Sequence, residues 1–233
     1  MIYVTGDLHG GLDTKKLLKL PFITEVKEDD VLIVCGDFGY VWETRPEFYD
    51  VERAKLNLLM KFIKCTMLFI TGNHENFSRY STFPVTELYG GKVQKITEKC
   101  YRVMDGEVLK INGKRFLFIG GAESFDKQYR TEGKNWWRDE RVSIKAVNKA
   151  IKNSNNIDYV ISHCAPLSIR NKIFLNENIP FNPNEVDESC KNLELLYAHI
   201  AGKKWKWFMG HYHLDVVYKP FYVLYNKIMK LED

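Results

Sequence analysis

The chain has 233 residues, 45% of them hydrophobic and 27% charged, with a formal net charge of +4 at pH 7. A chain of this length and composition is expected to form a soluble globular protein with a core large enough to need no disulfides. The charge is too small to argue by itself for nucleic acid or a membrane surface, and no apolar run approaches the ~20 residues that span a bilayer.

The first third of the sequence alternates between strand and helix patterns. We expect strands at Ile2–Thr5, Val31–Val34 and Met67–Ile70, because these runs are short, apolar and rich in residues that favour strands. The segments Leu12–Leu20 and Pro46–Lys64 have apolar residues at helical spacing, and a proline suits a helix start. A short polar block follows each predicted strand directly, so we expect these blocks to lie together at one rim of a sheet.

The rest of the chain changes pattern at residue 85. Short strands and turns are expected from 85 to 119, where Asn112-Gly113 between two apolar runs is a strong hairpin signal. A long polar loop should follow at 120–139. The remaining predicted elements are a helix at 141–153, a strand at 159–161, a helix at 186–201, a strand at 205–209 and two strands within 216–225.

Five of the six histidines lie in or next to polar blocks that follow apolar runs. Histidine, aspartate and asparagine are typical ligands of transition metals. The candidate ligands are Asp7, His9, Asp37, Asn73, His163, His211 and His213.

The spacing of these candidates fits a pair of metal ions. Two ions ~4 Å apart need a bridging carboxylate, and Asp37 is the isolated acid available for that position. Asp7 and His9 are two residues apart, so on an extended segment they point to the same side and can share one ion. His211 and His213 have the same spacing, but Gly210 and a turn would let them serve different ions. Mixed nitrogen and oxygen ligation favours manganese, iron, zinc or cobalt over calcium, and the lack of thiolates favours catalysis.

The ordered blocks resemble the calcineurin-like metallophosphoesterases, in particular bacterial and phage members without a firm substrate. The family pattern is Asp-x-His, Gly-Asp, Gly-Asn-His-Glu, a lone His and Gly-His-x-His. It is matched in order by Asp7/His9, Gly36-Asp37, Gly72-Asn73-His74-Glu75, His163 and Gly210-His211-Tyr212-His213.

The resemblance implies a fold, a ligand set and a mechanism. The fold is α/β, two mixed β-sheets packed as a sandwich and flanked by helices, here as one domain over residues 1–233. Asp7, His9, Asp37 and His213 would hold one divalent ion, and Asp37, Asn73, His163 and His211 the other. A hydroxide bridging two ions, most often manganese, with iron, zinc, cobalt or nickel as alternatives, would attack phosphorus. His74 would be catalytic rather than a ligand, giving a proton or hydrogen bond to the leaving oxygen.

Three positions depart from the family pattern. Several branches have an acid three residues after the bridging aspartate, which orients the catalytic histidine, whereas here that residue is Tyr40. The protein phosphatases follow it with a phosphate-binding arginine, and here the residue is Val41, which argues against that branch. Tyr212 stands where a small Ser or Thr is common and could alter access to the ions.

The loop from Gly120 to Glu140 leaves two interpretations open. Arg130 and Arg138 could grip phosphate oxygens while Trp136 and Trp137 stack on a base. Alternatively, the tryptophans anchor the loop and its charges are solvated. Cys164, next to His163, could be a nucleophile or a packing residue, and packing is the simpler interpretation. The five cysteines are scattered and odd in number, which suits a reducing cytoplasm.

The expected function is a metal-dependent phosphatase acting on a small phosphorylated molecule, a nucleotide or a phosphoprotein. A phosphodiesterase or nuclease, or a non-catalytic scaffold of the same fold, are the alternatives. A nuclease on long DNA is not favoured because no long basic stripe is present. No membrane partner is expected, and the sequence does not indicate an oligomeric state.

Overall fold

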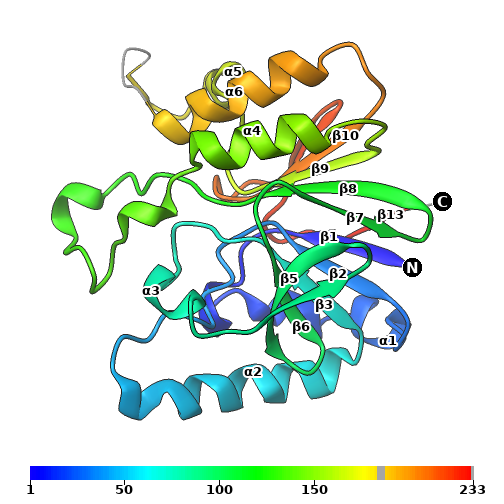
Figure 1. Cartoon of the computed structure of the whole chain (residues 1–233), viewed down its shortest axis with the longest axis vertical. Helices are drawn as coiled ribbons and strands as arrows, with labels where there is room; N and C mark the ends of the chain where they lie inside the picture. The colour runs from blue at the N-terminus through cyan, green and yellow to red at the C-terminus, as the bar shows by residue number, and fades with distance from the viewer. Residues whose placement is uncertain (183–186, 232–233) are drawn as a thin grey trace.

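The computed structural model describes residues 1–182 and 187–231 and contains two β-sheets that face each other (Figure 1). One sheet has seven strands in the order β13-β1-β2-β3-β6-β5-β4, and the other has six in the order β11-β12-β10-β9-β8-β7. The strands are β1 (Ile2–Thr5), β2 (Val31–Val34), β3 (Thr66–Phe69), β4 (Val85–Leu88), β5 (Gly91–Thr97), β6 (Cys100–Val103), β7 (Glu107–Ile111), β8 (Lys114–Ile119), β9 (Tyr159–Ser162), β10 (Lys206–Met209), β11 (Val216–Tyr218), β12 (Phe221–Val223) and β13 (Met229–Leu231).

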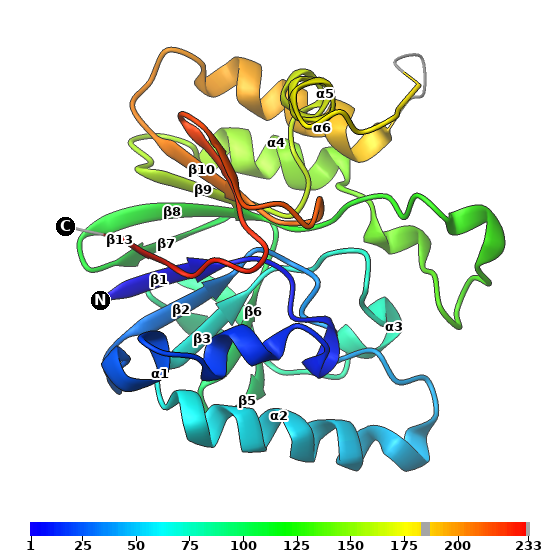
Figure 2. The same ribbon diagram turned by 180° about the vertical axis from the view of Figure 1, so that it is seen from behind.

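Helices cover the outer face of each sheet. Figure 2 shows α2 beneath the first sheet and α4, α5 and α6 above the second. The helices are α1 (Phe22–Glu25), α2 (Tyr49–Ile63), α3 (Phe77–Tyr80), α4 (Ile144–Asn153), α5 (Leu167–Asn176) and α6 (Glu188–Ile200). This α/β sandwich of two mixed sheets confirms the expected fold class, while the expected single domain stays a prediction.

The core has three layers because the central strands are buried on both faces. Val4 and Ile33 of the first sheet pack with Phe118 and Phe208 of the second, between the sheets. Alternate residues of the same strands point outward to the helices, as Leu32 does toward α2. The second outer layer joins strands β8–β10 and β12 to α4–α6. Burial on both faces explains the continuous apolar runs in the sequence.

Most of the predicted elements are present, with their ends displaced by a few residues. The hairpin at Asn112-Gly113 is confirmed, since β7 and β8 pair antiparallel across it. The helix predicted from Arg141 begins at Ile144, because the side chain of Ser143 caps it by accepting a hydrogen bond from Ala146 N. The helix predicted from Val186 begins at Glu188, and Val186 itself lies outside the described residues.

One expected element was wrong, and some elements of the structure had not been expected. The segment Leu12–Leu20 is not an α-helix: it contains a 3-10 helix, Thr14–Leu18, preceded by another at His9–Gly11. Leu20 precedes a proline, which disfavours the α conformation, and Leu17 is buried whereas Leu12 and Leu20 are exposed. Helix α5 and strand β13 were not anticipated.

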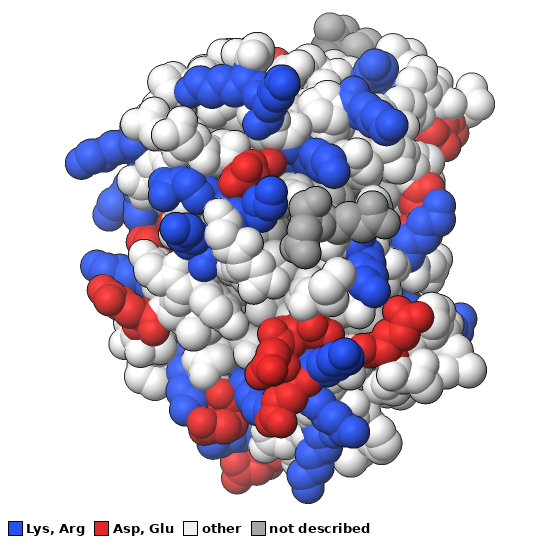
Figure 3. Space-filling view, turned by 90° about the vertical axis from the view of Figure 1, so that its right-hand side faces the viewer, with Lys and Arg blue, Asp and Glu red and all other residues white. Residues whose placement is uncertain are grey.

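One face of the molecule carries charges of both signs. On the face nearest the chain termini, basic and acidic side chains are intermixed, with more basic ones in the upper half of the view (Figure 3). Within 1–182 and 187–231, no helix has both the length and the apolar character needed to cross a membrane.

Candidate metal centre

The candidate ligands lie where strands of both sheets end. Asp7 follows β1, Asp37 follows β2 and Asn73 follows β3, all in the first sheet. In the second sheet, His163 follows β9 and His211 follows β10. Parallel strands end at one edge, so residues more than 200 positions apart along the chain meet there. The prediction that the blocks share one rim is therefore confirmed.

Four of the candidates have an unusual backbone. His9 (φ 45°), Asp37 (φ 46°), His211 (φ 69°) and His213 (φ 53°) all occupy the left-handed region. Residues other than glycine rarely adopt this conformation, and they concentrate at functional sites where the surroundings hold them in place. The sharp turns aim these side chains back toward the strand ends.

Two glycines allow the blocks to approach closely. A Cβ at Gly72 would lie 2.1 Å from Oδ1 of Asp37, and one at Gly36 would lie 2.3 Å from Nδ1 of His163. No side chain fits at either position without displacing a candidate ligand. The glycines in the Gly-Asp and Gly-Asn-His-Glu blocks are thus required by the packing of the site itself.

The first cluster contains Asp7, Asp37 and His163, all of them buried. Nε2 of His163 lies 3.2 Å from Oδ1 of Asp37, and its Nδ1 lies 3.6 Å from Oδ1 of Asp7. Nδ1 also lies 2.7 Å from the carbonyl oxygen of Cys35. A proton on Nδ1 donated to that carbonyl leaves Nε2 facing Asp37 as the free nitrogen.

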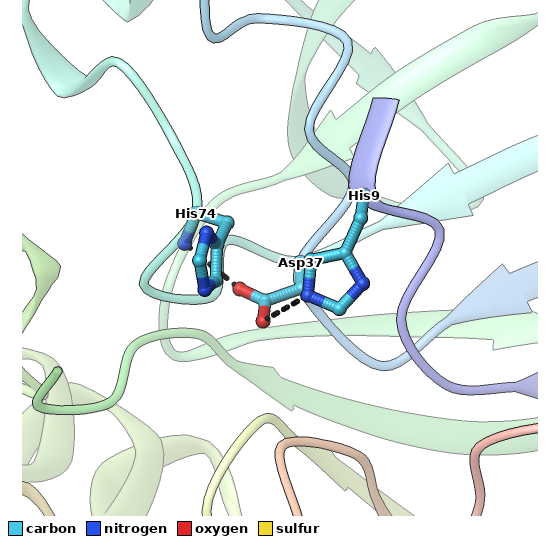
Figure 4. Close-up of side chains that lie close together, drawn as sticks. All are labelled: His9, Asp37 and His74. Carbon is cyan, nitrogen blue, oxygen red and sulfur yellow. Dashed lines mark hydrogen bonds and ion pairs between the residues drawn. The ribbon is translucent and has the colours of Figure 1, made fainter. Parts of the chain in front are cut away.

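The second cluster contains His9, Asp37 and His74. Figure 4 shows Asp37 between the two imidazole rings, with Nε2 of His9 3.1 Å from Oδ2 of Asp37. The main-chain N–H groups of Asn73 and His74 both donate to Oδ1 of Asp37, at 2.8 and 2.9 Å. Asp37 belongs to both clusters, which is the geometry a bridging carboxylate requires. His74 is near enough to be a third ligand, so its predicted role as a proton donor stays a prediction.

The other three candidates border these clusters. Oδ1 of Asn73 lies 3.2 Å from Nε2 of His163, and the ring of His211 lies 4.9 Å from that of His163. His213 is exposed, with its ring 5.2 Å from that of His9 and stacked on Tyr225. All seven predicted ligands thus lie in or beside one site.

Among the residues that the structure describes, two buried atoms of the site find no hydrogen-bond partner: Oδ2 of Asp7 and Nε2 of His211. A buried polar atom without a partner is costly, and a bound cation would satisfy both a carboxylate oxygen and an imidazole nitrogen. The residues present therefore fit divalent metal ions with nitrogen and oxygen ligands.

The electrostatics of the site also favour added positive charge. Burial raises the pKa of Asp7, with His163 opposing the effect. Burial would raise the pKa of Asp37 too, but His163 and His9 hold it well below its usual range. Against their own burial, the carboxylates raise the pKa of His9 to about 9 and that of His163 to about 10. Protons on these rings occupy the nitrogens that a metal would need.

His74 is not oriented by the residue at position 40. The buried hydroxyl of Tyr40 is 3.0 Å from Oγ1 of Thr14, and within 1–182 and 187–231 the ring of His74 has no hydrogen-bond partner. The ring of Trp42 lies 5.6 Å from it. Burial lowers the pKa of His74, with Asp37 opposing and His9 adding to the effect.

Several residues support the site through contacts that were not predicted from the sequence. Oδ2 of Asp13 lies 2.6 Å from Nδ1 of His9, and the hydroxyl of Tyr225 donates to Oδ1 of Asp13 at 2.9 Å. The buried carboxylate of Glu75 accepts from Phe38 N. The spacing of His9 and Asp13, four residues apart, was the only available signal, since the other contacts join distant segments.

The long loop borders the site and is anchored by its tryptophans. The indole of Trp137 donates to Oγ of Ser78 at 3.0 Å, and that of Trp136 to Oε1 of Glu140 at 2.8 Å. Phe125 stacks on the ring of His211, with centroids 5.1 Å apart. Arg130 pairs with Asp126 at 2.7 Å. These contacts favour the anchoring interpretation, although the loop reaches a candidate ligand.

Packing also shows where the side chains of Tyr212 and Cys164 lie, which the sequence left open. The hydroxyl of Tyr212 accepts from Ala165 N at 2.9 Å, and its ring packs edge-on against Phe174, so the side chain turns into the core under α5. Cys164 is fully buried, and its thiol lies 3.4 Å from the carbonyl of Gly121. It is a packing residue.

Comparison with known proteins gives one result about the family. The family model described as calcineurin-like phosphoesterase matches residues 1–215, which is nearly the whole chain and includes every candidate ligand. No curated protein matches the chain. With the ordered blocks converging on one site at the strand ends, the chain belongs to the calcineurin-like phosphoesterase family.

Proposed function

We propose that the protein is a phosphoric ester hydrolase that uses two divalent metal ions. The observation that carries the proposal is the position of Asp37, whose Oδ2 lies 3.1 Å from Nε2 of His9 and whose Oδ1 lies 3.2 Å from Nε2 of His163. Asp7, His9, Asp37 and His213 would hold one ion, and Asp37, Asn73, His163 and His211 the other. When bound, such ions lower the pKa of a coordinated water and neutralise charge on the phosphoryl group.

The chain's own residues orient the site and handle a proton. Asp13 and the carbonyl of Cys35 fix the rings of His9 and His163 from behind. His74 lies at the edge of the site, where its N–H can be donated to the oxygen that leaves phosphorus. In the overall reaction a P–O bond to the alcohol breaks, water supplies the new oxygen on phosphorus, and the alcohol oxygen gains a proton.

Within this activity we favour a phosphatase acting on a small phosphorylated molecule, a nucleotide or a phosphoprotein, with manganese as the first metal to test. Nitrogen, carboxylate and amide ligands without a thiolate suit manganese, iron, zinc, cobalt and nickel. The mild net charge does not favour long nucleic acids as substrates.

The test uses metal-stripped protein reloaded with manganese. We expect it to regain hydrolysis of an aryl phosphate monoester, with less activity toward the matching bis-aryl diester. Preference for the diester would replace the phosphatase by a phosphodiesterase. A protein that binds metals but hydrolyses neither ester would contradict the proposed hydrolase and favour a scaffold.

A further inference from the structure

One cleft adjoins the metal centre and has no role in the function proposed so far. It has a volume of about 440 Å³, and His9 and His74 form one of its walls. The remaining walls are largely apolar and come from three segments: Leu12 after β1, Trp42 and Phe48 in the connection after β2, and Val51 in the first turn of α2. This volume is within the range of ~300–1,000 Å³ that is typical of small-molecule sites.

The aromatic wall of the cleft is fixed before any ligand arrives. The main-chain N–H of Trp42 donates to Oε1 of Glu52 at 2.8 Å, which ties the loop to α2. The indole ring lies edge-on to Trp137, with centroids 5.6 Å apart, and Trp137 is itself buried and hydrogen-bonded to Ser78. Trp42 remains half-buried, with its ring 5.6 Å from that of His74. A preorganised indole loses little entropy when a flat group stacks on it.

The charges around the cleft favour an anionic ligand. Glu52 is paired with Arg79 at 2.5 Å, and Glu43 with Arg45 at 3.1 Å, so both carboxylates are engaged. Lys55 also lines the cleft and is exposed on α2. Within 1–182 and 187–231 it forms no ion pair, so the charge left free at this wall is positive.

We propose that this cleft binds the leaving group of the substrate, and that this leaving group carries an aromatic ring system, as a nucleoside does, which stacks on Trp42. The inference rests on the proposed hydrolase activity, because it is the place of His74 next to the leaving oxygen that directs the departing group into this cleft. Lys55 attracts the anionic ester to the same wall. Substrates whose leaving group is small and aliphatic leave the apolar wall uncovered.

The test compares adenosine 5′-monophosphate with ribose 5-phosphate. Both esters release the same type of primary oxygen, so the base is the difference that the enzyme can recognise. We expect kcat/KM of the manganese-loaded protein to be roughly tenfold higher for the nucleotide, which is typical of a base stacked on an aromatic side chain. Trp42→Leu should bring the ratio of the two kcat/KM values close to one, whereas Trp42→Phe should keep most of it.

Two results would overturn the inference: equal kcat/KM for both esters in the wild type, or an equal loss on both esters in Trp42→Leu. The second would mean that Trp42 only supports the fold. A second measurement separates this inference from the hydrolase proposal. If neither ester is hydrolysed, the aryl phosphate assay still tests the hydrolase proposal, and calorimetric binding of the two esters to manganese-loaded protein tests the cleft separately. Nucleotide binding no tighter than that of ribose 5-phosphate would then exclude an aromatic subsite.

The proposed role of the Lys55 charge can be tested against a matched control, Lys61, on the same helix. Lys61 is also exposed on α2 but does not line the cleft. At low salt, Lys55→Glu should weaken binding of adenosine 5′-monophosphate several-fold, while Lys61→Glu should leave it at the wild-type value. Equal weakening by both variants would show that only the net charge of the protein matters, contrary to the proposed placement.

Discussion

The carboxylate of Asp13 lies 2.6 Å from Nδ1 of His9, and its other oxygen accepts a hydrogen bond from Tyr225. This contact determines which nitrogen of His9 is available, because Nδ1 is engaged by Asp13 while Nε2 faces Asp37 at 3.1 Å. Carboxylates behind a ligand histidine fix its orientation and raise its basicity. Asp13 therefore supports the metal centre by orienting His9, although it is not one of the predicted ligands.

We expect Asp13→Ala to weaken metal binding by about 10- to 100-fold, the usual effect of losing such a carboxylate. The reason is that His9 would then be free to rotate away from Asp37. Competition with a chelator of known affinity measures the change. Asp29→Ala is the matched control, because Asp29 is exposed and precedes β2, at the opposite end of that strand from Asp37. Equal affinities for Asp13→Ala and the wild type would show that His9 is held by its backbone alone.

Loss of the bridging carboxylate should affect both ions at once. We predict that Asp37→Asn lowers the bound metal from two ions per chain to less than one and abolishes hydrolysis of an aryl phosphate. His211→Ala should also abolish turnover, but it should reduce the affinity for one ion more than for the other. Elemental analysis together with an activity assay gives both quantities. His199→Ala, an exposed change on α6, should match the wild type. Full metal content in Asp37→Asn would argue against a shared ligand.

His74 can be tested as a proton donor against a role as a ligand. If it acts on the leaving oxygen, His74→Ala keeps both metals and lowers kcat by roughly 10²- to 10⁴-fold, as expected for loss of general acid catalysis. The loss should be smaller for esters with acidic leaving alcohols, which need no proton. Metal content and kcat are measured on the same samples. A loss of metal in this variant would instead make His74 a ligand, as its closeness to His9 and Asp37 permits.

The parts of the fold that could be predicted are those with local signals. The runs at Ile2–Thr5 and Val31–Val34 are strands buried on both faces, and their apolar character is sufficient to identify them. The polar blocks after them were recognised because their residue types and order are specific. Helix α5 was missed since Arg170 and Asn171 interrupt its apolar spacing, and burial of Ile173 and Phe174 depends on neighbours from other segments.

The supporting contacts of the site could not be predicted, because they join residues far apart in the chain. Tyr225 and Asp13 are separated by 212 positions, and their hydrogen bond exists only once β12 and β1 have brought both segments to the same edge. The position of Trp42 depends similarly on Trp137 from the long loop. Residue type indicated the ligands, whereas only packing revealed what orients them.

Finally, protein stripped of metal should become less stable as the pH rises above 6.5. The folded-state pKa of His9 is about 9 and that of His163 about 10, both above their ordinary value of 6.5. A group whose pKa is raised on folding contributes its full stabilisation at pH values below its unfolded-state pKa. This contribution is lost as the pH rises through the folded-state pKa. Between pH 6.5 and 9, each such histidine lowers the free energy of unfolding by up to about 1.4 kcal/mol per pH unit. Denaturant unfolding of the stripped protein at pH 6.5 and 8 measures this slope.

The contribution of these histidines to the pH slope can be isolated with the variant His163→Asn and with manganese-loaded wild-type protein. Lys16, whose pKa burial lowers to about 8, changes stability in the opposite direction at higher pH, so the two measurements stay at or below pH 8. His163→Asn should reduce the slope in stripped protein, and manganese should reduce it in the wild type, because metal-bound rings carry no proton at the ligating nitrogen. A slope that is the same in all three samples would show that His9 and His163 are not protonated in the folded, metal-free protein.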